Sequence, residues 1–249
     1  MKKYRLIVLL FSFSLLISCN KEVLDKQPLE IISDATVWGD KALINAYLTR
    51  CYSEMYFFAN ESTGLGYSGD AWLDNWVVNE VSDECIPQWR DYEDALSRWR
   101  YKHGKLTING GLMEFWGYGT IRKLNEFIER VPTSPIEPDI AKVRVAEARF
   151  LRAFAYFAMV KRYGGVPLIT KVQQPTDPQD ELYPKRDKEE VVYDFIISEI
   201  NAIANDLPEV VGSSDLGRPS KYAALALKSR AALYAGSIAQ FGNVQLVLL

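Results

Sequence analysis

The stretch from Ala146 to Thr170 constrains the fold of this chain more than any other part of it. Its apolar residues recur every three or four positions, the spacing of one face of an α-helix: Val143, Ala146, Phe150, Ala153, Phe157 and Val160. A second apolar set covers another flank of the same helix: Leu151, Phe154, Ala155 and Ala158. A helix that is apolar on more than one side is buried between other helices. The sequence therefore predicts a helical core built around this segment.

The end of this helix is marked just as clearly. Gly164-Gly165 follows Tyr163, and glycine takes the left-handed conformation that ends many helices without steric strain. Val166 stands before Pro167, and the residue before a proline avoids the helical region of conformational space. We therefore expect the helix to stop at the glycine pair and the chain to leave it as an extended segment.

Other periodic segments indicate further helices, so that helices are predicted over residues 40–58, 112–131, 141–163, 187–207 and 221–239. Asp40 and Ser220 are the predicted N-caps of the first and last helices, and Asp187 with Glu190 forms a predicted capping box. The alanine-rich helices 141–163 and 221–239 are the predicted inner members of helix pairs. Paired helices are typical of tetratricopeptide-type arrays, although the strict repeat consensus is absent. The predicted fold is therefore all-α, with degenerate helix-pair repeats and long irregular loops.

Each predicted helix carries a stripe of residues that we expect to be buried. The stripe of the first helix is Ile44, Tyr47, Leu48, Cys51, Tyr52 and Met55. The stripe of the helix over 187–207 is Val192, Ile196, Ile200, Ile203 and Leu207, and that of the last helix is Ala223, Leu227, Ala231, Tyr234, Ile238 and Phe241. In the helix over 112–131, Asn125 lies on the apolar stripe, where a structural hydrogen bond is expected rather than a ligand contact. Arg149 and Arg152 are likewise expected to form ion pairs within the scaffold.

The first eighteen residues have the features of a secretion signal. A basic start precedes an apolar run that is too short to anchor the chain across a bilayer, and the run ends in Leu16-Ile17-Ser18-Cys19. This pattern predicts cleavage before Cys19 and acylation of that cysteine, which would attach the protein to a membrane surface. The alternative is an ordinary signal peptide with an incidental cysteine. The predicted organisation is a leader over 1–18, a polar tether over 19–36 and one helical domain over 37–249.

Composition limits the partners of the domain. Three of the 29 basic residues lie in the leader, so the remainder, with 32 acidic residues, carries a net charge of about −6. A mildly acidic domain without a basic block is a poor nucleic-acid binder. Cys51 and Cys85 are too few for a disulfide framework, and Cys51 is predicted to be a buried thiol.

The sequence contains no motif that indicates catalysis or a cofactor. His103, the single histidine, has no nucleophile motif beside it, and the chain has no Cys-x2-Cys or His-x3-His pair for a metal. Carboxylate pairs such as Asp83 and Glu84 are expected by chance among this many acidic residues. We therefore expect no enzyme activity, no metal and no cofactor.

A segment between the first two helices is rich in tryptophan and in polar residues. Sugars place their apolar C–H faces on aromatic rings and direct their hydroxyls to amide and carboxylate groups. The candidate ligand-binding residues are therefore Trp72, Asp74, Asn75, Trp76, Trp89 and Trp99. The alternative is that these tryptophans belong to the core, where large aromatic side chains dominate the packing energy.

Several segments resemble the SusD/RagB family of outer-membrane nutrient-binding lipoproteins. The strongest is EARFLRAFAYFAMVKRYGGVPLIT over 147–170. The Cys-x4-Leu-Asp-x2-Pro arrangement that begins at Cys19, and the segments that begin at Lys185 and Gly217, are also similar. The resemblance covers nearly the whole chain in family order and weakens over 60–110 and after 242. Members of the family continue well past this point, so the chain resembles the N-terminal part of a longer protein.

The resemblance implies a function as well as a fold. It implies a non-catalytic lipoprotein on the surface of the outer membrane that binds oligosaccharides and acts with a TonB-dependent, SusC-like transporter. Peptide cargo also remains open. One alternative is a scaffold that docks the transporter without binding a ligand, and a second is a glycosidase.

Overall fold

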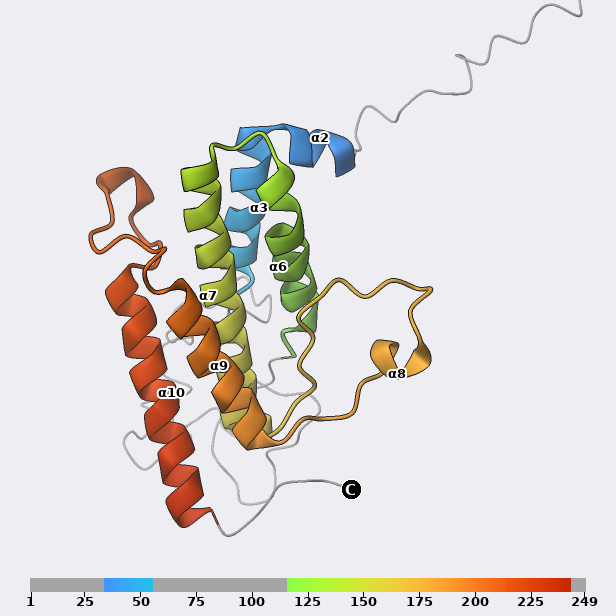
Figure 1. Cartoon of the computed structure of the whole chain (residues 1–249), viewed down its shortest axis with the longest axis vertical. Helices are drawn as coiled ribbons and strands as arrows, with labels where there is room; N and C mark the ends of the chain where they lie inside the picture. The colour runs from blue at the N-terminus through green and yellow to red at the C-terminus, as the bar shows by residue number, and fades with distance from the viewer. Residues whose placement is uncertain (1–33, 56–115, 243–249) are drawn as a thin grey trace, which may run out of the picture. The chain divides into compact units, whose positions relative to one another are not determined.

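A computed structural model describes residues 34–55 and 116–242 of the chain, and every regular element in these two ranges is helical. The elements are α2 (Asp34–Gly39), α3 (Lys41–Ser53), α6 (Tyr118–Arg130), η3 (Val131–Thr133), α7 (Pro138–Tyr163), α8 (Gln179–Leu182), α9 (Glu189–Ile203), η4 (Ser213–Asp215) and α10 (Lys221–Phe241) (Figure 1). The chain divides into two units, Met1–Val37 and Trp38–Leu249, and the helix packing described below lies within the second.

The central helix of this unit is α7, which packs between α6 on one side and α9 on the other (Figure 1). Pro138 lies in its first turn, and Lys161 and Arg162 lie in its last turn, where positive charge complements the helix dipole. From Ala146 to Val160 nearly every side chain is buried, including Ala153 and Tyr156, which have no exposed surface. The prediction that this helix is buried on more than one side is therefore confirmed.

The first and second predicted helices pack against each other as α3 and α6. Asp40 caps α3 as expected, because its carboxylate accepts a hydrogen bond of 2.9 Å from the Leu43 amide. The predicted α3 stripe is confirmed in its main members, since Ile44, Leu48 and Cys51 are fully buried. Burial raises the pKa of the free Cys51 thiol to about 12, so this cysteine behaves as a small apolar core residue. Trp38 completes this side of the core by packing its ring on Tyr47 and Phe127.

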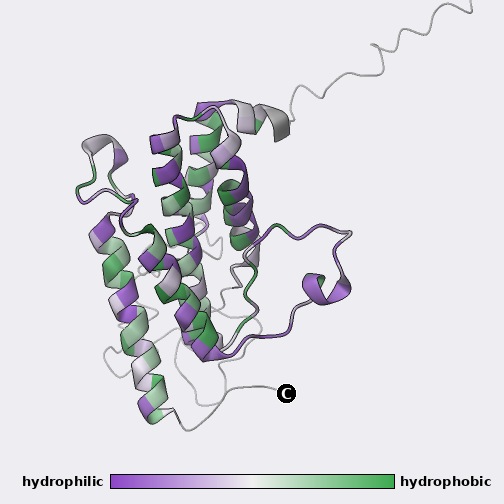
Figure 2. Ribbon diagram, in the orientation of Figure 1, coloured by the Kyte–Doolittle hydropathy of each residue, from purple (hydrophilic) through white to green (hydrophobic). Residues whose placement is uncertain are grey.

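The residues of the stripe predicted over 187–207 are buried, although α9 ends at Ile203 and Leu207 lies beyond it, whereas the stripe predicted for α10 is partly wrong. Val192, Ile196, Ile200, Ile203 and Leu207 are all buried. In α10 the side facing α9 is formed by Ala224, Leu227 and Ala231, so the stripe begins one position later than predicted. Phe241, placed on the stripe by its spacing, is 70% exposed. In Figure 2 much of α10 has the hydrophobic colour, with hydrophilic residues between.

The predicted capping box at Asp187 is also wrong. The N-cap residue of α9 is Lys188, and no side chain caps this helix. The Asp187 carboxylate instead accepts a hydrogen bond of 2.8 Å from the Leu168 amide, in the extended segment that follows α7. Asp187 therefore fixes the path of the chain as it leaves α7, and α9 begins without a side-chain cap.

Candidate functional site

In the described part of the chain, the extended segment from Val166 to Lys171 has no partner strand. Side chains from the neighbouring helices hold it in place instead. Gly164 ends α7 with a φ of 66°, as predicted, and its amide donates to the Val160 carbonyl. The Tyr118 hydroxyl donates to the Pro167 carbonyl at 2.9 Å. The Tyr156 hydroxyl accepts from the Ile169 amide at 2.7 Å and donates to the Ile169 carbonyl at 3.1 Å. Side chains thus satisfy backbone groups that a sheet would otherwise pair.

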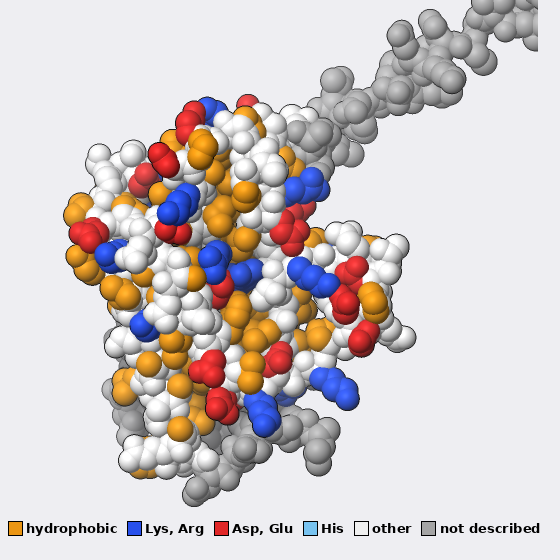
Figure 3. Space-filling view, viewed as in Figure 1, with side chains coloured by type: hydrophobic (Ala, Val, Ile, Leu, Met, Phe, Trp, Pro, Cys, Tyr) orange, Lys and Arg blue, Asp and Glu red, His pale blue; other side chains and the backbone are white. Residues whose placement is uncertain are grey.

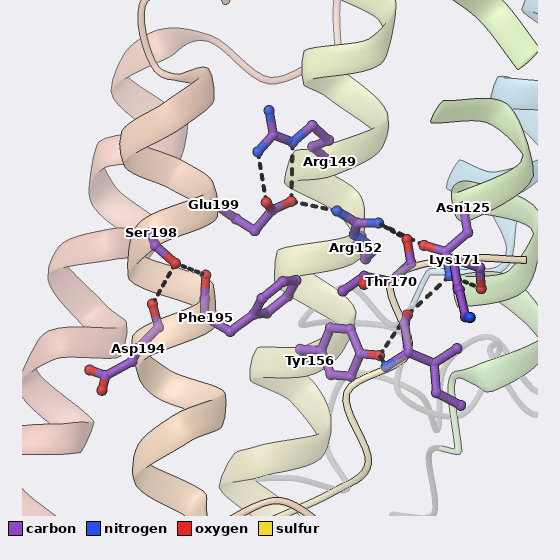
Figure 4. A network of polar contacts seen from close by, with 11 residues as sticks. Asn125, Arg149, Arg152, Tyr156, Thr170, Lys171, Asp194, Phe195, Ser198 and Glu199 are labelled. Carbon is purple, nitrogen blue, oxygen red and sulfur yellow. Dashed lines mark hydrogen bonds and ion pairs between the residues drawn. The ribbon is translucent and has the colours of Figure 1, made fainter. Parts of the chain in front are cut away.

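Beside this segment lies a partly buried polar cluster, here called the arginine network: Asn125, Arg149, Arg152 and Glu199 (Figure 4). Arg149 donates two hydrogen bonds to the Glu199 carboxylate, at 2.7 and 3.2 Å. Arg152 donates to the same carboxylate at 2.7 Å and to the Asn125 side-chain oxygen at 2.7 Å. These contacts join α6, α7 and α9 through one carboxylate and two guanidinium groups. The predicted scaffold ion pairs of Arg149 and Arg152 are confirmed.

Asn125 is the link between the network and the extended segment. Its side-chain nitrogen donates to the carbonyls of Ile169 and Lys171, at 3.0 and 3.1 Å, and the residue is fully buried. Arg152 adds a third contact to this segment, at 3.1 Å from the Thr170 carbonyl. The prediction that Asn125 is a structural hydrogen-bonding residue is therefore confirmed.

The electrostatics of the arginine network favour a charged Glu199. Burial by itself raises the pKa of this carboxyl, but hydrogen bonds and charge from Arg149 and Arg152 outweigh burial, and the pKa lies below its usual value. The Arg152 guanidinium also lies 5.7 Å from the centre of the Phe195 ring. Both oxygens of the Glu199 carboxylate accept hydrogen bonds from arginines, and these contacts hold α9 to α7.

A second buried cluster surrounds Glu147 on α7, whose side chain is 2% exposed. Its carboxylate pairs with Arg144 and Arg218 and accepts a hydrogen bond from the Tyr52 hydroxyl at 3.2 Å. Asp215 pairs with the same two arginines, at 2.9 and 3.0 Å. The cluster joins α3, α7 and the loop before α10. The sequence offered a partial signal for it, because Arg144 and Glu147 are spaced as an i, i+3 helix pair.

The residues predicted to contact ligand lie outside the described residues: Trp72, Asp74, Asn75, Trp76, Trp89 and Trp99. Cys19 and Cys85 lie outside them as well. Among the described tryptophans, Trp38 is buried, whereas Trp116 is 39% exposed and stacks on Tyr163 with ring centres 4.1 Å apart. Within the described ranges, no helix is long and apolar enough to cross a membrane. Those ranges also contain no group of three or more histidine, cysteine, aspartate or glutamate side chains placed to hold a metal ion.

Comparisons of sequence place this helical unit among known proteins. Residues 24–233 match the profile of a SusD-like family described as starch-binding and associating with the outer membrane. A SusD-like protein of Formosa agariphila is 31% identical over 241 residues, which cover 94% of this chain and 43% of that protein. A SusD-like protein of Bacteroides ovatus is 28% identical over 230 residues, which cover 89% of this chain and 38% of that protein.

Solved structures share the fold. A SusD-like protein of Bacteroides fragilis superimposes with a TM-score of 0.67 at 31% identity, over 90% of this chain and 42% of that one. A laminarin-binding SusD-like protein superimposes with a TM-score of 0.61 at 24% identity, over 81% of this chain and 42% of that one. The chain therefore spans about two fifths of the length of these relatives. The predicted all-α fold is confirmed, and the chain belongs to the SusD-like family.

Proposed function

We propose that this chain is part of a non-catalytic glycan-binding lipoprotein on the outer-membrane surface, and that it acts with a SusC-like TonB-dependent transporter in nutrient uptake. The observation that carries the proposal is the family match over residues 24–233, in a family described as starch-binding and associating with the outer membrane. The shared fold with the SusD-like protein of Bacteroides fragilis supports it. The cargo class is an oligosaccharide, with peptides as the alternative.

Within this proposal, ligand contact falls to the tryptophan-rich segment between α3 and α6. Trp72 and Trp76 supply ring faces on which a sugar can stack, and Asp74 and Asn75 between them supply partners for its hydroxyls. Trp89 and Trp99 extend the same set. The described helices support this division, because the arginines and carboxylates of α7 and α9 named above are engaged in contacts within the scaffold.

The test is ring removal at Trp72 and Trp76. Trp72→Ala and Trp76→Ala should each weaken binding on an array of α- and β-linked glucans and other glycans, while the unfolding temperature stays near that of the parent. Trp38→Ala is the matched control, because Trp38 is buried against Tyr47 and Phe127 and its loss should cost about 3–5 kcal/mol of stability. Unchanged glycan affinity in both folded variants would remove this segment from the binding site.

A second candidate function is a scaffold that docks the transporter without binding a ligand. Co-purification with a TonB-dependent transporter, without affinity for any glycan on the array, would select the scaffold. Release of shortened sugars from a bound glycan would instead indicate a glycosidase.

A further inference from the structure

The start of α6 and the end of α7 lie at the same end of the helical unit, and each carries a large aromatic residue (Figure 1). Trp116 precedes Gly117, the N-cap residue of α6, and Tyr163 is the last residue of α7. Their rings stack with centres 4.1 Å apart and with planes inclined by only 1°. The packing of α6 on α7 therefore holds two distant residues, here called the aromatic pair, with their rings parallel.

Neighbouring contacts fix the position of the aromatic pair. The Arg186 side chain donates to the carbonyls of Tyr163 and Gly165, the latter at 2.6 Å, and so holds the end of α7. The Tyr118 ring lies 6.4 Å from the Trp116 ring at an angle of 16°, and its hydroxyl is bonded to the extended segment after α7. The pair is therefore held in place before any ligand arrives, which lowers the entropy cost of binding to it.

Trp116 reaches the surface although it is stacked. Its exposed fraction is 39%. Tyr163 covers one side of the indole ring, so the exposed surface of Trp116 lies on the other side of the ring and along its edges. Single hydrophobic side chains lie among charged ones over the face shown in Figure 3, and one such residue needs no special explanation. The aromatic pair differs from them because it presents a flat and rigid ring surface.

The surroundings of the aromatic pair are polar. Arg186 is exposed, and within the described residues its two carbonyl contacts use two of the five N–H donors of a guanidinium. Burial raises the pKa of the Tyr118 hydroxyl and the positive charge of Arg186 opposes this rise, which places the guanidinium near Tyr118. Gly119 leaves open space, because a Cβ atom there would meet nothing within 4 Å. A ring beside guanidinium donors suits a sugar, whose apolar C–H face lies on a ring and whose hydroxyls accept hydrogen bonds.

We propose that the aromatic pair is a stacking platform for one glucose ring of a glucan, and that the Arg186 guanidinium donates hydrogen bonds to hydroxyls of the same glucan. This role rests on the proposed function, and the description of the family as starch-binding supports a glucan. The net negative charge of the chain disfavours acidic glycans. The platform would add a contact site on the described helices to the one proposed between α3 and α6.

The test separates the ring of Trp116 from its bulk. Trp116→Leu removes the ring but keeps an apolar side chain against Tyr163, whereas Trp116→Phe keeps a ring. Isothermal titration calorimetry measures the affinity of the whole protein, expressed from its own gene, for maltohexaose and for laminarihexaose, an α-linked and a β-linked glucan. For the glucan that the parent binds, Trp116→Leu should weaken binding by about ten-fold and Trp116→Phe should stay within about three-fold of the parent.

Two further variants complete the set. Arg186→Lys keeps the positive charge but loses the guanidinium fork, and it should also weaken binding, by about three-fold or more. Tyr183→Ala is the matched control, because Tyr183 is 75% exposed, lies just after α8 and is not part of the aromatic pair, so its loss should leave the affinity unchanged. Far-ultraviolet circular dichroism and thermal melts confirm that each variant folds.

Unchanged glucan affinity in folded Trp116→Leu would overturn the proposal and leave the proposed function standing, because the parent still binds. If that variant instead loses co-purification with a TonB-dependent transporter while its glucan affinity is unchanged, the aromatic pair belongs to a protein contact and the proposal is wrong. A parent that binds neither glucan but binds another glycan on the array would overturn the glucan platform alone. A parent that binds no glycan on the array would overturn both the platform and the proposed function.

Discussion

Gly165 is a position where the neighbouring backbone leaves no room for a side chain. A Cβ atom at this position would lie 1.9 Å from the Asp187 carbonyl oxygen, a backbone atom that cannot rotate away. Gly165→Ala should therefore push the extended segment off the start of α9 and destabilise the chain by about 2–3 kcal/mol. Urea unfolding measures the change. Gly212→Ala is the control, because a Cβ there meets nothing within 4 Å, and it should stay within about 0.5 kcal/mol of the parent.

Glu199 is the residue on which the arginine network depends. Glu199→Gln leaves Arg149 and Arg152 facing a neutral amide in a largely buried site, which should cost about 3 kcal/mol. The pKa of Glu199 is lowered in the folded chain, so its contribution to stability is present above the unfolded pKa and is lost as the pH falls through the folded pKa. The parent should therefore lose stability on acidification more steeply than the variant.

Urea unfolding between pH 7 and pH 3 distinguishes this linkage from a general loss of packing. Asp194→Asn is the control on the same helix, because Asp194 is exposed and its substitution should change the stability by less than about 0.5 kcal/mol. If the free energy of unfolding falls as steeply on acidification in Glu199→Gln as in the parent, the stabilising charge lies elsewhere.

At the scale of the element, α7 is the helix that tolerates least added volume. Ala153 has no exposed surface, and large apolar side chains flank it along the same helix. Ala153→Leu should overpack a helix–helix contact and destabilise the chain by about 1–3 kcal/mol. Ala202→Leu is a matched control, since Ala202 lies on α9 and is exposed. If the thermal melts of Ala153→Leu and of the control both coincide with that of the parent, the helix–helix contact at Ala153 accommodates a larger side chain without strain.

At the scale of the whole molecule, the predicted attachment to the membrane rests on one cysteine. Leu16-Ile17-Ser18-Cys19 predicts acylation, and two or more acyl chains on Cys19 would hold the folded domain at the outer membrane. Cys19→Ala should shift the protein to an uncleaved or released form and abolish incorporation of labelled fatty acid. Cys85→Ala is the control and should leave both readouts as in the parent. Unchanged fractionation and acyl labelling in Cys19→Ala would contradict the lipoprotein prediction.

Much of the helical framework follows from the order of residues alone, because its causes are local. A three-and-four spacing of apolar residues fixes which side of a helix is buried, and Ile196, Ile200 and Ile203 are buried as that rule requires. Gly164 ends α7 because glycine adopts a positive φ without strain. The family likeness rests on the same local patterns, so the order of residues is sufficient to reveal it.

Contacts between distant residues required the folded chain. Glu199 meets Arg149 and Arg152 across 50 and 47 residues, and nothing in the spacing of charges marks that carboxylate among 32 acidic residues. Asp187 has the sequence of a helix cap, but the Leu168 amide lies within its reach and takes its carboxylate instead. The apolar stripe of α10 gives its buried side to within one position, yet whether the opposite side is covered depends on which helices pack there. Local patterns determine which side of a helix is apolar. Which distant residues form contacts, and which helix faces are covered, depends on how the helices pack in the folded chain.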